Sequence, residues 1–143
     1  MLNVPNLAQA EKFYTEILGF DIVNRLDHPH AVFLTLGVQH HDIALFQVAE
    51  DDNRGWRERE TRLHHFALQL ADTTAVRYAH TFLKQSGVAI LRAVDHGTTH
   101  SVYVHDPAGN RVELYCDIGV NGLERARTRT IRDVKDFPLL DLG

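Results

Sequence analysis

One order of predicted elements occurs twice in this chain of 143 residues, and the repeat limits the folds open to it. The helix-stopping glycines Gly19 and Gly87 lie 68 residues apart, and Asp42 and Asn110 open matching strands at the same offset. The pattern predicts helices over 7–18 and 73–86, and strands over 20–25, 31–37, 42–48, 63–70, 88–93, 99–105 and 110–116. We therefore expect an α+β fold of two paired βαβββ modules that form a cup-shaped mixed sheet, with the first strand truncated.

The repeat also sets the predicted domain boundaries. We assign 1–52 to the first module, 53–62 to a polar linker, 63–117 to the second module and 118–143 to a C-terminal strap. Met1–Val4 is interpreted as the remnant of the first module's opening strand. The strap is basic in its middle and apolar at its end, which favours docking on the body of the protein over an anion-binding arm.

Composition argues against several classes of function. Lys and Arg number 15 against 19 Asp and Glu, and the formal charge of −4 argues against a nucleic-acid binder, which needs a basic face for phosphates. Cys116 is the single cysteine, so neither an internal disulfide nor a CxxC metal site is available. No apolar run approaches the roughly 18 residues of a membrane span and no signal segment is recognised, so we expect a cytoplasmic protein without membrane partners. Ten histidines make a metal site the first kind of site to test.

Strand alternation brings three of the polar side chains to one face. Residues two apart share a face, so His64 and His100 fall on the apolar face expected to pack on the helix. His65, Tyr103 and Glu113 fall on the opposite face. Histidines with a carboxylate are the ligands that non-haem Fe(II) prefers, and Zn²⁺ or Mn²⁺ accept similar donors. A single His or Glu on a strand is commonly a solvated or hydrogen-bonded residue, so spacing alone leaves both interpretations open.

A set of motifs along the chain resembles a known family. The motifs are Asn3-Val4-Pro5-Asn6-Leu7, Phe13-Tyr14, Leu18-Gly19-Phe20, and the segments 40–46, 63–67, 95–97 and 103–115. Over nearly the whole chain up to Cys116, they resemble the vicinal oxygen chelate superfamily, specifically its type I extradiol ring-cleavage (catechol 2,3-type) dioxygenases. The Asp-Pro-x-Gly-Asn-x-x-Glu turn and strand is shared across that superfamily and indicates the fold alone.

The resemblance implies a role for each matching residue. His65 and Glu113 look like two metal ligands, with Fe(II) as the expected metal. His41 resembles the histidine that hydrogen-bonds the oxygen species and moves a proton, and His96 resembles the one that contacts a substrate hydroxyl. Tyr103 resembles the acid that protonates the ring-expanded intermediate. The implied partners are a small aromatic diol and O₂, and association as a homodimer is expected from the family.

The sequence departs from the dioxygenase pattern at one ligand. The family places its first metal histidine a few residues before the Asn3-Val4-Pro5 motif, a position that would lie upstream of Met1. Either the start was assigned too late, or the chain was trimmed, or the ligand is truly lost, and we favour a start assigned inside the strand because the rest of the site is intact. His28 and His30 fall in a loop between strands and do not replace it.

Other functions of the same superfamily remain open. Glyoxalase I-type isomerases take a glutamate from each module, but the residue that corresponds to Glu113 at the 68-residue offset is Leu45. Thiol-transferring fosfomycin-resistance proteins use two histidines and a glutamate, so this ligand set does not separate them from dioxygenases. A non-catalytic binding protein would need no metal, and Trp56 could stack on its planar ligand.

Overall fold

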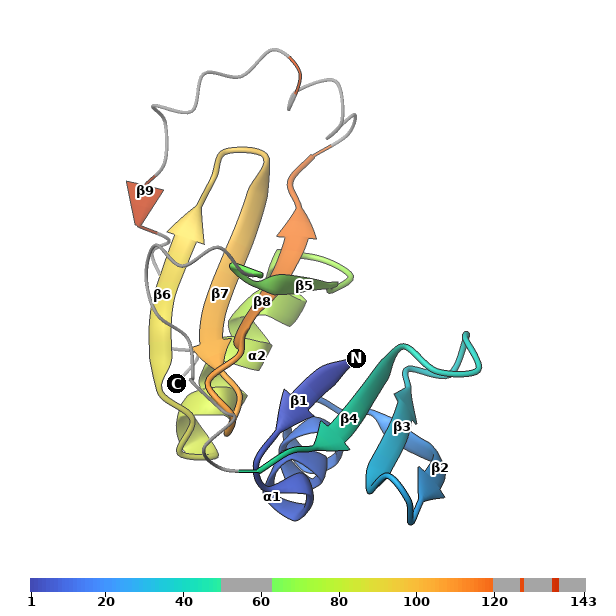
Figure 1. Cartoon of the computed structure of the whole chain (residues 1–143). Helices are drawn as coiled ribbons and strands as arrows, with labels where there is room; N and C mark the ends of the chain where they lie inside the picture. Colours follow the sequence, from blue (N-terminus) through green and yellow to red (C-terminus); the bar gives the residue numbers. More distant parts are fainter. Residues whose placement is uncertain (50–62, 120–126, 128–134, 137–143) are drawn as a thin grey trace. The chain divides into compact units, whose positions relative to one another are not determined.

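The computed structural model describes residues 1–49, 63–119, 127 and 135–136, in two compact units (Figure 1). Met1–Glu60 and Asp106–Asn110 belong to the first unit, and the other residues belong to the second. The predicted linker 53–62 with Trp56, and nearly all of the predicted strap, lie outside the described residues. None of the described helices is long and apolar enough to cross a membrane.

The first unit holds one mixed sheet of four strands, in the order β1-β4-β3-β2. Its strands are β1 (Leu2–Val4), β2 (Asp21–Leu26), β3 (Ala31–Thr35) and β4 (Ile43–Gln47). β1 pairs with β4 in parallel and the other pairs are antiparallel. Buried residues of this sheet include Val4, Val32, Leu34 and Leu45, which form its core with Ala10 of the helix.

The first helix differs from its prediction in its second half. Asn6 caps α1 (Leu7–Lys12) by accepting a hydrogen bond from the Gln9 N–H, as the sequence indicates. From Phe13 to Ile17 the helix continues as the π-helical segment η1, closed by the bond from Leu18 N–H to Phe13 O. Phe13 and Tyr14 at its start are buried, as a helical period predicts, whereas the wider turn itself is not predicted by that period.

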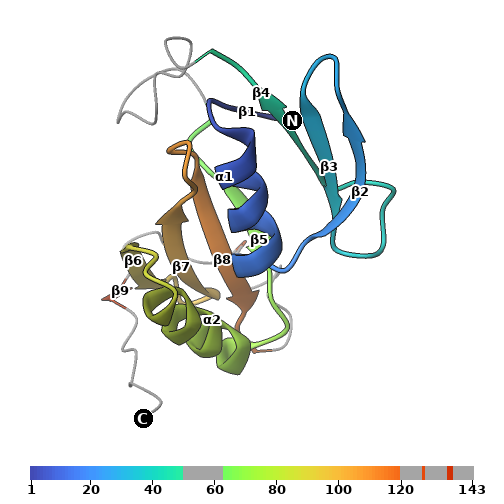
Figure 2. The same ribbon diagram turned by 90° about the horizontal axis from the view of Figure 1, so that it is seen from below.

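The second unit repeats this arrangement with one additional strand. Its sheet has the order β5-β8-β7-β6-β9, built from β5 (Phe66–Gln69), β6 (Ile90–Asp95), β7 (Thr99–His105), β8 (Arg111–Asp117) and β9 (Lys135–Asp136). The helix α2 (Thr73–Gln85) covers one face of β6, β7 and β8 (Figure 2). Val76 and Leu83 of this helix are buried, as are Val102, Leu114 and Cys116 of the strands. The order of elements confirms the α+β prediction of two βαβββ modules.

The turn between β7 and β8 is fixed by one carboxylate. Oδ1 of Asp106 accepts the Ala108 and Asn110 N–H groups at 2.9 and 2.8 Å. Oδ2 accepts the Asn110 side-chain amide at 2.8 Å and the buried hydroxyl of Tyr14 at 2.9 Å. Gly109 adopts a φ of 84°, a conformation that favours glycine. The Asp-Pro-x-Gly-Asn segment therefore sets where β8 begins, and with it the register of Glu113.

We expect Tyr14→Phe to lower the free energy of unfolding by about 1–2 kcal/mol, because it removes a buried hydrogen bond to a carboxylate. Burial, followed by the charge and hydrogen bond of Asp106, raises the pKa of Tyr14. The folded chain then keeps a proton that the unfolded chain releases above about pH 10, so wild-type stability should fall as the pH rises through that value. Urea unfolding from pH 7 to 11 should show a smaller alkaline loss in Tyr14→Phe. Equal stability of the two proteins at pH 7 would contradict this role for the hydroxyl.

Candidate functional site

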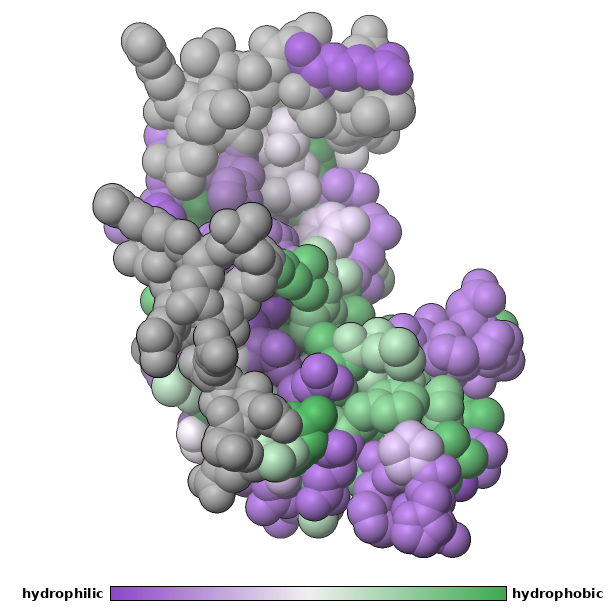
Figure 3. All heavy atoms as spheres, in the orientation of Figure 1, coloured by the Kyte–Doolittle hydropathy of each residue, from purple (hydrophilic) through white to green (hydrophobic). Residues whose placement is uncertain are grey.

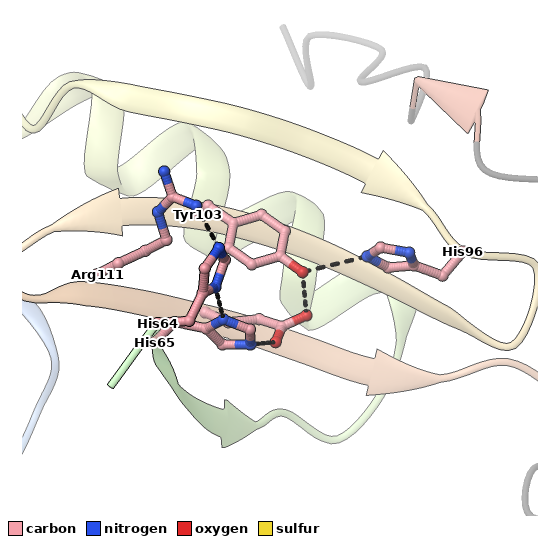
Figure 4. A network of polar contacts seen from close by, with 6 residues as sticks. His64, His65, His96, Tyr103 and Arg111 are labelled. Atoms are coloured by element: carbon pink, nitrogen blue, oxygen red, sulfur yellow. Dashed lines mark hydrogen bonds and ion pairs between the residues drawn. The ribbon is translucent and has the colours of Figure 1, made fainter. Parts of the chain in front are cut away.

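The register of β7 and β8 brings a tyrosine and a glutamate together on the second unit. Tyr103 pairs directly with Glu113, which pairs with Ala67 of β5 on its other side. Directly paired residues point to the same face of a sheet, so strand alternation predicts this neighbourhood correctly. The Tyr103 hydroxyl donates a hydrogen bond of 2.7 Å to Oε1 of the largely buried Glu113 (Figure 4).

His65 lies immediately before β5 and reaches the other oxygen of the same carboxylate. Its Nε2 is 3.0 Å from Oε2 of Glu113, and its ring meets the Tyr103 ring edge-on at a centroid distance of 5.7 Å. The predicted strand over 63–70 is therefore too long at its start. β5 begins at Phe66, whose partner is Val112 of β8.

His96 approaches the tyrosine from the turn between β6 and β7. Its Nε2 lies 3.1 Å from the Tyr103 oxygen (Figure 4). Because the Tyr103 O–H already donates to Glu113, the His96 N–H is the donor in this contact. The turn is held by the bond from His96 N–H to Thr99 O and by Asp95 Oδ1, which accepts the Gly97 N–H.

The half-buried Tyr103 keeps its proton. Burial raises the pKa of Tyr103, and the hydrogen bond and negative charge of Glu113 raise it further. The hydroxyl is therefore a proton donor that stays protonated at neutral pH while it faces a carboxylate.

The fifth predicted residue, His41, belongs to the first unit. It precedes β4, its Nδ1 lies 2.6 Å from His40 Nδ1, and its ring packs edge-on against Phe33 at a centroid distance of 5.2 Å. His65, His96, Tyr103 and Glu113 form one polar network of the second unit, and the role of His41 stays a prediction.

Sequence reasoning missed two residues that extend this network beyond His65, His64 and Arg111, and it placed His64 on the wrong face. His64 was expected on the apolar face, but it precedes β5, where strand alternation no longer applies, and it is exposed. Its Nδ1 lies 2.6 Å from His65 Nδ1, and its Nε2 lies 3.3 Å from Nη1 of Arg111 (Figure 4). The sequence did hold a signal for Arg111, which stands two residues before Glu113 and so shares its face.

The His65–Glu113 pair fits two neighbouring ligands of one metal ion. Histidine nitrogen and carboxylate oxygen bind such ions at about 2.0–2.2 Å, so two ligands at a right angle lie about 3 Å apart. The distance of 3.0 Å between Nε2 and Oε2 matches this separation. Within residues 1–49, 63–119 and the short described parts of the tail, no group of three or more His, Cys, Asp or Glu could hold a metal ion. His65 and Glu113 would therefore supply two metal ligands, and the described residues supply no third one of these types beside them.

A second polar chain lies on the opposite face of the same sheet. His100 Nδ1 is 2.9 Å from the Thr73 hydroxyl at the start of α2, and His100 Nε2 is 3.9 Å from Asp95 Oδ1. The Thr73 oxygen also lies 3.8 Å from the sulfur of the buried Cys116. This chain connects the helix to the strand end that precedes His96.

We expect the folded protein to lose stability below about pH 6.5, the pKa of histidine in an unfolded polypeptide. Burial lowers the pKa of His100, although the charge of Asp95 opposes the shift. The unfolded chain therefore takes up a proton that the folded chain resists, and stability falls with pH through this range. Urea unfolding of wild type and His100→Gln between pH 7.5 and 5 should show a shallower acid loss in the variant. Parallel pH curves would contradict the assignment.

Known proteins that are similar to this chain belong to one superfamily but differ in their activities. The model of the Glyoxalase/Bleomycin resistance protein/Dioxygenase superfamily matches residues 1–114. The chain is 31% identical to a biphenyl-2,3-diol 1,2-dioxygenase of Rhodococcus globerulus, over 82% of this chain and 60% of that protein. It is 30% identical to a lactoylglutathione lyase of Neisseria meningitidis, over 80% of this chain and 85% of the lyase. The curated dioxygenases that it matches are longer, and the chain spans between 33% and 60% of them.

A solved structure shares the fold at low sequence identity. The fosfomycin resistance protein FosX of Listeria monocytogenes superposes with a TM-score of 0.68 at 19% identity, over 90% of this chain and 93% of that protein. Together with the family match over most of the chain, the arrangement of strands and helices shows that this chain belongs to the Glyoxalase/Bleomycin resistance protein/Dioxygenase superfamily, also called the vicinal oxygen chelate superfamily.

Proposed function

We propose that the protein is an Fe(II)-dependent extradiol dioxygenase that cleaves the ring of a small catechol with O₂. The observation that carries the proposal is the single network in which His65 and Glu113 are joined to Tyr103 and His96. The network combines two proposed metal ligands, His65 and Glu113, with a tyrosine that stays protonated. His96 is hydrogen-bonded to that tyrosine. Sequence identity of 28–34% to several curated ring-cleavage dioxygenases supports the same assignment.

His65 Nε2 and Glu113 Oε2 would hold the metal. Fe(II), when bound, supplies the electron transfer between catechol and O₂ that ring cleavage requires. Mn²⁺ and Zn²⁺ accept the same nitrogen and oxygen donors, but Zn²⁺ has no redox chemistry. The choice of Fe(II) therefore follows from the proposed reaction and not from the donor atoms.

Tyr103 would donate a proton to the substrate, and His96 would orient the tyrosine hydroxyl. Tyr103 holds a proton at its hydroxyl because its pKa is raised, and it can release that proton to a substrate oxygen that gains negative charge. His96 donates to the Tyr103 oxygen, so it fixes the direction in which the tyrosine O–H points. We propose that a catechol hydroxyl is bound beside this pair, and that His41 moves a second proton.

We also propose that the protein forms a homodimer and is located in the cytoplasm. Within the described residues β2 is one of the two edge strands of its sheet, and all of its residues are exposed. Its apolar side chains Ile22, Val23 and Leu26 are exposed. Figure 3 shows hydrophobic residues among hydrophilic ones on the face of the molecule that it draws. An exposed strand edge of this kind can pair with another chain.

Isomerase-type chemistry is the second candidate, favoured by 30% identity to a lactoylglutathione lyase. The chain spans 85% of the N. meningitidis lactoylglutathione lyase, far more than of the dioxygenases. Against it, Leu2 pairs with Leu45 as Ala67 pairs with Glu113, and Leu45 is completely buried. An apolar residue thus stands in the first unit where an isomerase of this type would need its second glutamate.

Oxygen consumption tests the proposal against these alternatives. The Fe(II)-reconstituted chain should consume one O₂ per catechol and form no lactoylglutathione from glutathione and a 2-oxoaldehyde. Formation of lactoylglutathione without O₂ uptake would favour the isomerase. Binding of catechol without either reaction would favour a non-catalytic binding protein.

A further inference from the structure

Arg111 and His64 form the outer end of the network in Figure 4, and they set the direction of its hydrogen bonds. Nη1 of Arg111 lies 3.3 Å from His64 Nε2. A guanidinium has donors and no acceptor, so His64 Nε2 accepts in this contact. A neutral imidazole carries its proton on the other nitrogen when one nitrogen accepts. His64 therefore has its N–H at Nδ1, which faces His65 Nδ1 at 2.6 Å.

The same reasoning extends through His65 to the carboxylate. His65 Nδ1 accepts from His64, so the His65 proton is on Nε2. This Nε2–H lies 3.0 Å from Oε2 of Glu113, which accepts it. Oε1 of Glu113 accepts the Tyr103 hydroxyl. Every contact from Arg111 to Tyr103 then has one donor and one acceptor.

Metal binding at His65 requires the hydrogen bond between His64 and His65 to run in the opposite direction. The nitrogen that faces Glu113 must offer a lone pair to the ion, and a metal-ligating histidine donates its other N–H to a nearby acceptor. His65 Nδ1–H would then point at His64 Nδ1, which would have to accept. His64 would carry its proton on Nε2, directed at an arginine that has only donors. The two arrangements are incompatible while Arg111 keeps its contact with His64.

We propose that Arg111, acting through His64, holds His65 in the tautomer that opposes metal binding, so that an ion is bound only when the Arg111–His64 contact is released. Arg111 and His64 are positioning residues in this scheme. The inference rests on the proposed function in taking His65 as the metal ligand, whereas the direction of the hydrogen bonds stands on the contacts alone.

Nitrogen-15 NMR of the metal-free full chain tests the direction without any metal or activity. We expect the His64 proton on Nδ1 and the His65 proton on Nε2 in wild type. Arg111→Lys keeps a cation that only donates and should preserve this pattern. Arg111→Gln offers both an amide donor and a carbonyl acceptor, and should allow both tautomers of His65. A wild-type His65 with its proton on Nδ1 would overturn the proposal, whatever the enzyme does.

Zn²⁺ titration against a competing chelator tests the consequence for metal binding. We expect Arg111→Gln to bind Zn²⁺ about tenfold more tightly than wild type, the scale on which residues behind a metal ligand act. Arg111→Lys should match wild type. Arg92→Gln is the charge control, because Arg92 pairs with Tyr103 across β6 and β7.

The two measurements separate the inference from the proposed function. An equal gain in Arg92→Gln and Arg111→Gln would assign the effect to lost positive charge and overturn the tautomer argument. Equal affinity of wild type and all three variants would also overturn it. Failure of every protein to bind Zn²⁺ would contradict the metal site of the proposed function, and the NMR pattern alone would then decide the hydrogen-bond direction.

Discussion

Replacing Glu113 by alanine is expected to abolish retention of Fe(II) by the chain after anaerobic reconstitution. The substitution removes the only carboxylate in the described network and leaves His65 Nε2 without its partner at 3.0 Å. Residues behind a ligand change metal affinity by about 10- to 100-fold, so loss of the ligand itself should weaken binding by at least about 100-fold. Iron content by elemental analysis, measured after gel filtration, gives the result directly.

Two further variants make this test specific. Glu113→Gln keeps the shape of the side chain and an acceptor for the Tyr103 hydroxyl, so it should fold normally and still lose the metal. Asp117→Asn removes a carboxylate from the exposed end of the same strand, where Asp117 accepts a hydrogen bond from Gln69, and it should retain iron. Wild-type iron content in both Glu113 variants, with thermal unfolding unchanged, would rule out the metal site.

The fold could be predicted from the sequence because its signals are local and occur twice. Asn6 and Asp72 cap the two helices through side-chain bonds to backbone N–H groups, and both helices are followed by a glycine with positive φ. The π-helical segment was not predictable in this way. Its residue Tyr14 is buried and bonded to Asp106, 92 positions away, a contact that local signals do not describe.

The candidate site was predictable only where strand pairing governs it. Alternation brings Tyr103 and Glu113 to one face because both lie inside long paired strands. His64 and His65 precede β5, so their directions follow from contacts with Arg111 and Glu113, which alternation does not describe. The neighbourhood of His96 depends on a turn whose conformation rests on Asp95 and Gly97.

Tyr103→Phe is expected to keep the metal and lose most of the turnover. The hydroxyl donates to Oε1 of Glu113, whereas the His65 contact uses Oε2, so the variant leaves the proposed ligand pair intact. It removes the proton that the raised pKa of Tyr103 holds beside the carboxylate. General acids contribute about 10²- to 10⁴-fold to rates, so kcat for a catechol should fall by this factor while KM changes less.

The control for this experiment is a tyrosine on the same sheet that lies outside the network. Tyr115 is two residues beyond Glu113 on β8 and pairs with Ser101, so Tyr115→Phe removes a hydroxyl from the same face without touching Glu113. It should leave kcat close to that of wild type. Full turnover by Tyr103→Phe with one bound iron would remove the tyrosine from the reaction, and His96 would then be the remaining acid of the second unit's network. Loss of iron from Tyr103→Phe would instead show that the hydroxyl is needed to hold Glu113 in its ligand position. Metal binding and proton donation would then both depend on Tyr103.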